Sequence, residues 1–209
     1  MKNKILSILL SIGFNLQDAE IISQDIITTY NKAERGYHDL THISNMLHNF
    51  DSFILNSAFA NKIYNINEFA FAVIMHDYVN GTKNDIELSV TKAKQFLHRI
   101  SKNYNCAYIE KLIRATDYEK IMQTDFEQQL MQDLDLLILG SNSAEYDVYA
   151  AKIRAQYNEF SDTTFNPNRI KILNIFLNRS HIYNITYFRD KYEKNARNNL
   201  NQEIQHLSN

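Results

Sequence analysis

The stretch FAFAVIMHDYVN, residues 69–80, decides how this chain is expected to fold. Its first seven residues, Phe69 to Met75, are apolar without interruption, and a helix that is apolar on every side is a buried helix. The run ends at His76 and Asp77, so the pattern brings an imidazole and a carboxylate to the edge of a protein core. Burying a carboxylate costs free energy unless the group is paired. The stretch therefore predicts either a hydrogen-bonded His–Asp pair or two ligands of a metal ion.

The composition of the whole chain favours helices around this core. Of the 209 residues, 44% are apolar, which is enough for a sizeable core, while only 4 are Gly and 1 is Pro. An all-β fold needs many tight turns, and Gly and Pro are the residues that usually make them. No repeat, linker or low-complexity tract divides the sequence. We therefore expect an all-α fold, with residues 1–209 in a single helical domain.

Charge and cysteine content argue against several classes of protein, although they do not exclude a local charged patch. The formal net charge is −2 and the isoelectric point is about 6.4, and neither value is typical of a surface for nucleic acid or membranes. The single Cys106 cannot form an intramolecular disulfide and fits a reducing compartment. The N-terminal MKNKILSILLSIGFN has no convincing cleavage site, and no apolar run approaches the roughly 20 residues of a membrane span. We expect a soluble, cytoplasmic protein that binds neither nucleic acid nor membranes.

Apolar residues at helical spacing predict at least seven helices and almost no strand. Asn67 stands where a cap of the core helix is expected, and Asn84 and Asn142 each precede a Glu by three residues, at Glu87 and Glu145, as in a capping box. The helical segments are expected at residues 3–12, 17–31, 37–50, 68–79, 84–100, 105–116, 124–139, 144–160, 167–178 and 186–206.

Side chains that ligate metals occur in three helical or apolar contexts. They are the pair His38 and His42, four residues apart, the dyad His76–Asp77, and the acids Asp133 and Asp135 within LMQDLDLLIL. Imidazole nitrogen and carboxylate oxygen suit a divalent ion, whereas a structural zinc site made of cysteines is excluded because the chain has no second Cys. Each pattern alone is weak, but the order in which they occur is more specific.

This order resembles the HD superfamily of metal-dependent phosphohydrolases, and more closely a family of predicted HD hydrolases of about this length. The resemblance covers residues 16–203. It implies a single HD-type helical bundle with a metal centre. The matching stretches are RGYHDLTHI (35–43), AVIMHDYV (72–79), ELS (87–89), LIRAT (112–116), DLDLLILG (133–140), YAAKIRAQY (149–157), NRIKILNIFLNRSHIY (168–183) and EKNARNNL (193–200).

The resemblance implies four metal ligands. His42 matches the first ligand histidine of HD proteins, His76 and Asp77 match the dyad that names the superfamily, and Asp135 matches the late aspartate. The family pattern uses the second Asp of such a motif, which favours Asp135 over Asp133. Because Asp135 is flanked by leucines, we also expect it to be the better-buried acid. The ion would be divalent, with Mn, Mg, Fe, Ni and Zn as candidates.

The stretch YHDLTH is similar to the Tyr-His-Asn-x-x-His stretch of cyclic-nucleotide phosphodiesterases, in which the first His donates a proton to the leaving group. His38 would take that role, although Asp39 stands where that pattern has Asn. Glu87 could contact the water at the metal or could only cap a helix. A second departure is ATDYEK at 115–120, where relatives often carry a His that a second metal would need, so one metal is favoured.

Arg35, Lys83 and Arg154 lie in or near the matched stretches and could stabilise the charge of a phosphoryl group. The alternative for each is a solvated surface charge. We expect a metal-dependent phosphohydrolase that cleaves a small-molecule phosphate ester, with a nucleotide as one candidate, by means of water activated by a divalent ion. The alternatives are a regulatory HD-like domain that binds a metal or a nucleotide without turnover, and a helical scaffold with a paired polar core.

Overall fold

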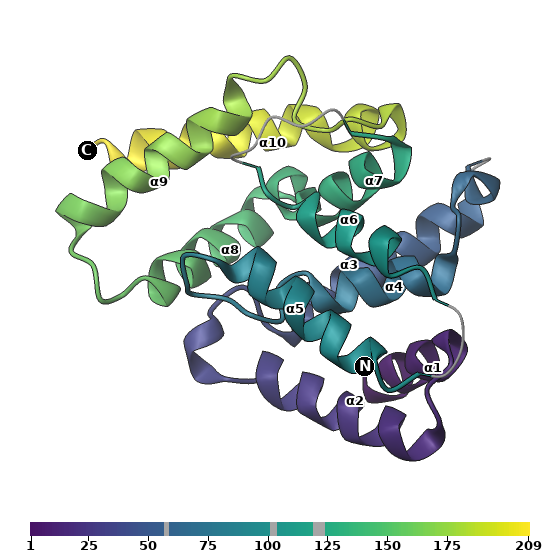
Figure 1. Ribbon diagram of the computed structural model, residues 1–209. Helices are drawn as coiled ribbons and strands as arrows, with labels where there is room; N and C mark the ends of the chain where they lie inside the picture. The colour runs from purple at the N-terminus through teal and green to yellow at the C-terminus, as the bar shows by residue number, and fades with distance from the viewer. Residues whose placement is uncertain (57–58, 101–103, 119–123) are drawn as a thin grey trace. The chain divides into compact units, whose positions relative to one another are not determined.

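In the computed structural model the protein is all-helical, as predicted (Figure 1). The structure describes residues 1–56, 59–100, 104–118 and 124–209, and these residues contain no strand. Each segment expected to be helical overlaps an α-helix, although α9 begins at Asp162 and not at Pro167. The α-helices are α1 (Lys2–Ile12), α2 (Leu16–Tyr30), α3 (Leu40–Asn56), α4 (Ile66–Met75), α5 (Asp85–Leu97), α6 (Cys106–Arg114), α7 (Phe126–Asp135), α8 (Ser143–Gln156), α9 (Asp162–Leu177) and α10 (Thr186–Leu207). Short 3-10 helices lie at η1 (Ala33–Arg35), η2 (Ala60–Lys62) and η3 (Leu137–Gly140).

The chain forms two compact units, residues 1–131 and residues 132–209. The boundary between them falls within α7, so one continuous helix contributes residues to both units. The single domain expected over residues 1–209 stays a prediction.

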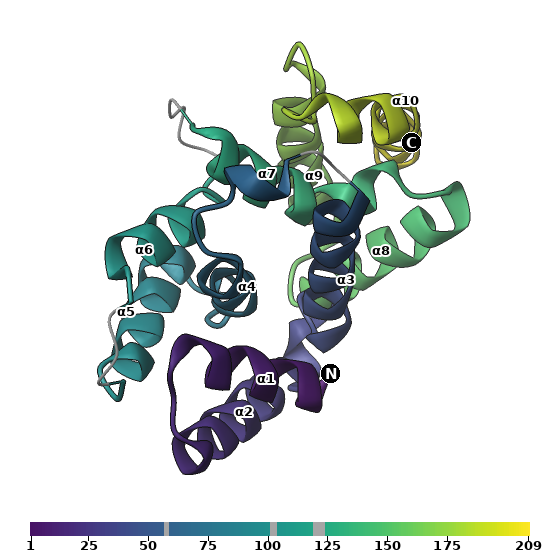
Figure 2. The same cartoon turned by 90° about the vertical axis from the view of Figure 1, so that its right-hand side faces the viewer.

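The helix α4 is the centre of the first unit. Figure 2 views it nearly end-on, and α1, α3, α5 and α6 each contact it. Its residues from Glu68 to Met75 are all buried. Phe69 to Met75 are apolar on every side of the helix, so each side can pack against a neighbouring helix. Burying a large apolar side chain contributes about 1.5–3 kcal/mol. The prediction that residues 69–76 are among the most buried is confirmed.

The ends of α4 differ from those predicted. Asn65, and not Asn67, caps the helix, because the Asn65 side chain accepts hydrogen bonds from the N–H groups of Asn67 at 3.0 Å and Glu68 at 3.2 Å. The helix ends at Met75 instead of residue 79, since the chain turns there and the N–H of Tyr78 bonds to the Met75 carbonyl at 3.2 Å. His76 and Asp77 therefore lie in a turn directly after a buried helix.

The capping box predicted at the start of α5 does not form. Asn84 makes no capping hydrogen bond with its side chain. Glu87 instead accepts two hydrogen bonds from the guanidinium of Arg114 in α6, at 2.8 and 2.9 Å. Asp85, the first residue of α5, turns back on the preceding loop and accepts a hydrogen bond from the N–H of Gly81 at 2.8 Å. Glu87, the residue on which the predicted capping box depended, is thus bonded to Arg114 of another helix.

In the second unit, α10 contacts α8, α9 and η3. The cap predicted for α8 is confirmed, since the Asn142 side chain accepts a hydrogen bond from the N–H of Glu145 at 3.0 Å. The loop that joins α9 to α10, residues 178–185, is held from α10 itself. Glu193 accepts hydrogen bonds from N–H groups of this loop, and Arg197 donates to carbonyls at the end of α9 and in the loop.

Candidate metal centre

His76 is placed by the end of α4. It follows the last helical residue, and only 1% of it is exposed. Its Nδ1 lies 2.8 Å from the carbonyl oxygen of Val73. A carbonyl only accepts hydrogen bonds, so Nδ1 must carry a proton, and in the neutral ring Nε2 then carries the lone pair. The backbone of α4 therefore selects the tautomer of His76 that can bind a metal through Nε2.

His42 is placed by the start of α3. The Asp39 side chain accepts hydrogen bonds from the N–H groups of Thr41 at 2.8 Å and His42 at 3.1 Å, which is the geometry of a helix N-cap. His42 therefore lies in the first turn of α3, and it is 3% exposed. Its Nδ1 lies 3.0 Å from the phenol oxygen of Tyr37, which leaves Nε2 to face His76.

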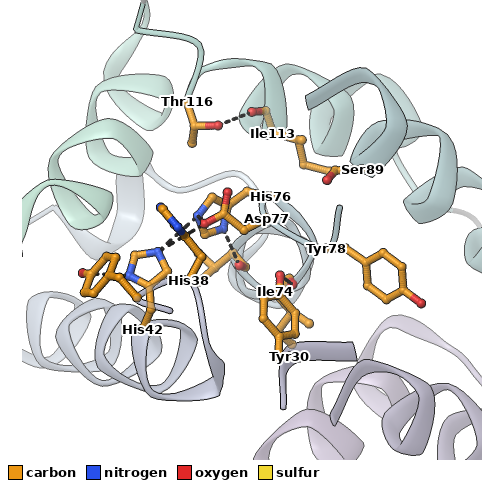
Figure 3. Close-up of polar contacts among 12 residues, drawn as sticks. Tyr30, His38, His42, Ile74, His76, Asp77, Tyr78, Ser89, Ile113 and Thr116 are labelled. Carbon is orange, nitrogen blue, oxygen red and sulfur yellow. Dashed lines mark hydrogen bonds and ion pairs between the residues drawn. The ribbon is translucent and has the colours of Figure 1, made fainter. Parts of the chain in front are cut away.

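Three donor atoms from these two elements converge on one point (Figure 3). The Nε2 atoms of His42 and His76 lie 3.3 Å apart. The Asp77 Oδ2 lies 3.1 Å from the His76 Nε2 and 3.6 Å from the His42 Nε2. Both imidazoles are buried, and the Asp77 side chain is 21% exposed, so the cluster has a protein side and a side that solvent can reach.

The size of this triangle fits a metal ion. Ligand bonds of about 2.1 Å at angles between 90° and 109° separate neighbouring donor atoms by about 3.0 to 3.4 Å. The three distances in the cluster, 3.1, 3.3 and 3.6 Å, lie in or close to that range. Metal-binding histidines usually donate their other ring N–H to a carbonyl or a similar acceptor. His76 does so toward Val73.

A count of protons leads to the same two alternatives that the sequence pattern predicted for this cluster. With both imidazoles neutral and Asp77 ionised, the His76 Nε2 and the Asp77 Oδ2 both carry lone pairs, yet they lie 3.1 Å apart. One proton on the His42 Nε2 can bridge only one of its two contacts. An additional proton on His76 or a divalent ion at the centre would relieve the repulsion between these two lone pairs. The predicted convergence of His42, His76 and Asp77 is confirmed, and both the His–Asp pair and the metal centre remain compatible with it.

The burial of Asp133 and Asp135 is the reverse of what we expected. Asp133 is 0% exposed and Asp135 is half-buried, so the expectation that Asp135 is the better-buried acid is wrong. The Asp133 carboxylate accepts hydrogen bonds from the backbone N–H and side-chain amide of Asn184, at 2.8 and 3.0 Å, and from the N–H of Ile185 at 2.7 Å. Burial raises the pKa of Asp133 to about 7, although these hydrogen bonds oppose the shift.

Asp133 therefore belongs to the second unit, where its hydrogen bonds hold the loop before α10 in place. Asp135 is the last residue of α7, and its assignment as the fourth ligand stays a prediction. The leucines beside both acids gave no means of distinguishing them, because the loop that buries Asp133 comes from about 50 residues further along the chain.

His38 lies in the turn before α3, so the helix predicted over 37–50 begins later than expected, at Leu40. The cap formed by Asp39 explains the difference, since a cap residue ends the helix on its N-terminal side. The His38 ring is 6.0 Å from the His42 ring and 5.3 Å from the Tyr37 ring, between centroids. His38 is thus near the cluster (Figure 3), without the one-turn spacing that it would have if residues 38–42 were helical, and its role as an acid stays a prediction.

Arg35 is not a surface charge, and that alternative is wrong, because the residue is 6% exposed. Its guanidinium donates hydrogen bonds to the backbone carbonyls of Asp77, at 2.5 Å, and of Tyr78. The structure thus gives Arg35 a contact with the turn that carries two of the candidate ligands. Binding of a substrate phosphate by Arg35 stays a prediction.

The other residues predicted to act on the substrate lie in varied surroundings. Lys83 is exposed in the loop before α5. Arg154 belongs to the second unit, where its guanidinium contacts Asp162 at 2.8 Å and backbone carbonyls at 3.0 Å. Glu87 is exposed and paired with Arg114. The catalytic and substrate-binding roles proposed for these residues stay predictions.

Of the segment ATDYEK (115–120), which departs from the family pattern, the structure describes residues 115–118. Thr116 is buried, and its hydroxyl donates a hydrogen bond to the carbonyl of Ile113 at 2.9 Å. Asp117 and Tyr118 are half-buried. Residues 119–120 lie outside the described part of the chain. The expectation of a single metal stays a prediction.

Two aromatic residues near the cluster escaped the sequence analysis. Tyr37 contacts the Nδ1 of His42 with its hydroxyl, and Tyr30 donates a hydrogen bond to the carbonyl of Ile74 at 2.6 Å. Tyr37 is five residues before His42, which is not a helical spacing, so only the YHDLTH pattern could have indicated it. No local signal connects Tyr30 with a carbonyl 44 residues away.

Comparisons with protein families, with curated proteins and with solved structures found no match. The likeness to HD hydrolases therefore stays an interpretation of the sequence patterns, and the metal centre is argued from its own geometry. Within the described residues, no helix is long and apolar enough to cross a membrane.

Proposed function

We propose that this protein is a metal-dependent phosphohydrolase of the HD type, in which His42, His76 and Asp77 hold one divalent ion. The observation that carries the proposal is the triangle of donor atoms from His42, His76 and Asp77, with sides of 3.1, 3.3 and 3.6 Å. The resemblance to HD proteins, which includes the same three residues, supports the proposal independently of the geometry.

The donor set narrows the choice of ion. Two imidazole nitrogens and a carboxylate oxygen suit Mn, Fe, Ni or Zn, whereas Mg prefers oxygen ligands and water. We therefore place Mg last among the candidates. The backbone contact of the His76 Nδ1 keeps that ring in the tautomer that such an ion requires.

The residues of the chain would divide the work of ester hydrolysis. A bound divalent ion supplies Lewis acidity that activates water and polarises a phosphoryl oxygen. His42, His76 and Asp77 hold their positions without rearrangement, because both rings are buried and bonded through Nδ1. As water attacks phosphorus and the ester P–O bond breaks, His38 in its charged form would donate a proton to the leaving oxygen. The proton that the water loses restores the charge on His38.

One observation favours the alternative of a binding domain without turnover. Two of the three cations expected to contact phosphate, Arg35 and Arg154, donate to backbone carbonyls in the structure. A site that lacks both of them would have less means to stabilise the phosphoryl charge in a transition state. A regulatory domain that retains the ion alone would show this arrangement.

The test uses the purified full chain. Metal content by elemental analysis and the Kd for Mn²⁺, Ni²⁺ and Zn²⁺ are measured for the wild type, for Asp77→Asn, and for His48→Ala, which alters an exposed histidine on the same helix as His42. We expect one ion per chain in the wild type and in His48→Ala, and none in Asp77→Asn. Hydrolysis of bis-p-nitrophenyl phosphate and of nucleoside monophosphates is then measured with each ion. Binding without turnover would favour the regulatory alternative, and no binding would leave the protonated His–Asp pair.

A further inference from the structure

The C-terminal end of α4 is buried, and its carbonyl groups are bonded one by one. The last carbonyls of a helix have no partner within the helix and need others when water is excluded. Here the Val73 carbonyl accepts from the His76 Nδ1 at 2.8 Å. The Ile74 carbonyl accepts from the hydroxyl of Tyr30 at 2.6 Å, and the Met75 carbonyl accepts from a backbone N–H at 3.2 Å. The end of the helix is thus tied to α2.

Arg35 continues this series into the turn that carries the candidate ligands. Its guanidinium donates to the carbonyl of Asp77 at 2.5 Å and to that of Tyr78. The nitrogen that bonds to Asp77 also lies 3.4 Å from the carbonyl of His38. The guanidinium lies over the Tyr30 ring, 4.6 Å from its centroid. One side chain therefore contacts the backbone of a candidate ligand and that of the candidate acid.

The chemistry of arginine explains why this residue type suits the position. The guanidinium is a rigid planar fork that stays charged, and hydrogen bonds from a charged donor are stronger than those between neutral groups. Two donors of the same fork fix the carbonyls of Asp77 and Tyr78 relative to each other. Lys would offer a single flexible ammonium and could not set that spacing.

The position also argues against a role in stability alone. No carboxylate forms an ion pair with Arg35 among the described residues, and its hydrogen-bond partners are backbone carbonyls. Burying a charge that is not paired is costly. An apolar side chain of similar size would fill this space more cheaply, so the cationic fork is best explained by what it holds.

We propose that Arg35, supported by the ring and hydroxyl of Tyr30, is the positioning residue of the metal centre. It holds the turn over residues 76–78 so that Asp77 faces His42 and His76 before any ion binds. This inference rests on the proposed metal centre, and it replaces a contact between Arg35 and the substrate by a contact with the backbone that carries the ligands.

The test compares Co²⁺ binding by the full chain with the thermal stability of the metal-free protein. The variants are Arg35→Ala, Arg35→Lys and the control Arg197→Lys, since Arg197 also donates to several backbone carbonyls but belongs to the second unit. We expect the Kd for Co²⁺ to rise about 10- to 100-fold in both Arg35 variants, and to stay unchanged in Arg197→Lys even if that variant is less stable. Guanidinium ion at low millimolar concentration should recover part of the affinity in Arg35→Ala.

The outcomes separate this inference from the proposed function. If the wild type binds none of Co²⁺, Mn²⁺, Ni²⁺ and Zn²⁺, both fail. If the wild type binds Co²⁺ and both Arg35 variants bind it equally well, the metal centre stands and the positioning role is overturned. If Arg35→Lys keeps its Co²⁺ affinity but loses turnover, Arg35 acts on the substrate and the inference is again overturned. Should Arg35→Ala fail to fold, Arg35→Lys and its visible Co²⁺ spectrum decide the matter.

Discussion

At the scale of single residues, the two ring nitrogens of His76 have separate tasks. Nδ1 donates to the carbonyl of Val73, and Nε2 faces Asp77 and His42. The first contact makes the second chemically useful, because it leaves the lone pair of the neutral ring on Nε2. In His42, likewise, Nδ1 contacts the hydroxyl of Tyr37 while Nε2 faces His76, but a phenol can donate or accept, so this contact does not select the tautomer. The cluster is therefore prepared by its neighbours as well as by its own side chains.

His38→Ala should separate binding from turnover. His38 lies near His42 but outside the triangle of donor atoms, with 6.0 Å between the ring centroids. A general acid contributes about 10²–10⁴-fold in rate, so under the proposed function we expect the variant to keep one metal ion and to lose most of the phosphatase activity. Asp77→Ala should lose both. Metal content, melting temperature and turnover are measured on both variants, and an unchanged rate in His38→Ala would remove it from the catalytic residues.

At the scale of elements, a charged network joins α5 to α6. Glu110 accepts from Lys94 at 2.9 Å and from Arg114 at 2.8 Å, and Arg114 continues to Glu87. The hydrogen bonds from Lys94 and Arg114 lower the pKa of Glu110 from 4.5 to about 2. Because the pKa is lower in the folded protein, the charged form stabilises the fold above pH 4.5, and this stabilisation is lost as the pH falls toward 2.

Glu110→Gln should remove that acid dependence. We expect the free energy of unfolding at pH 7 to fall by about 2 kcal/mol, since the cations are partly exposed and solvent screens them. The loss should shrink as the pH falls from 4.5 to 2, where the wild type also loses the charge. Denaturant unfolding at several pH values measures it. Asp51→Asn, which breaks the exposed pair with Lys4, is the control and should change little; an equal effect in both variants would contradict the prediction.

At the scale of the whole molecule, each unit contains a cluster of buried polar side chains. The first unit has the cluster at the end of α4. The second has a buried ion pair between Arg169 of α9 and Glu203 of α10, with contacts at 2.7 and 3.1 Å. The hydroxyl of Tyr146 in α8 also donates to Glu203. This pair and the Tyr146 hydroxyl connect the three long helices of the second unit, so loss of the pair should destabilise all three.

Glu203→Gln should destabilise the second unit strongly. It leaves the Arg169 charge buried without its partner, and breaking a buried pair in this way costs about 3–5 kcal/mol. Asp162→Asn is the matched control in the same unit, because it breaks an exposed pair with Arg154, for which we expect less than about 1 kcal/mol. Chemical denaturation followed by circular dichroism compares them. Similar small losses in both would show that the buried pair adds nothing beyond a surface pair.

Local pattern was sufficient for the existence of the helices, although it misplaced the start of α3 and both ends of α4. The run from Phe69 to Met75 is apolar in every direction, so its burial needed no knowledge of what packs against it. The cap at Asn142 formed as predicted because its partner, Glu145, lies in the same helical turn. The convergence of His42 with His76 and Asp77 came from a resemblance to known motifs, and the structure brings these three residues together.

Tertiary structure decided everything that depended on partners far along the chain. Glu87 left its predicted cap because Arg114 of α6 offers two charged hydrogen bonds. Asp133 became the buried acid because Asn184 and Ile185 bring N–H groups to it. Arg35 can be buried because its guanidinium bonds to carbonyls more than 40 residues further along the chain. The sequence by itself determined the helices, since spacing and apolarity are local properties, and its resemblance to known motifs indicated three of the candidate ligands. Only the fold decided which charges lie inside it, because each buried charge needs partners that no short stretch contains.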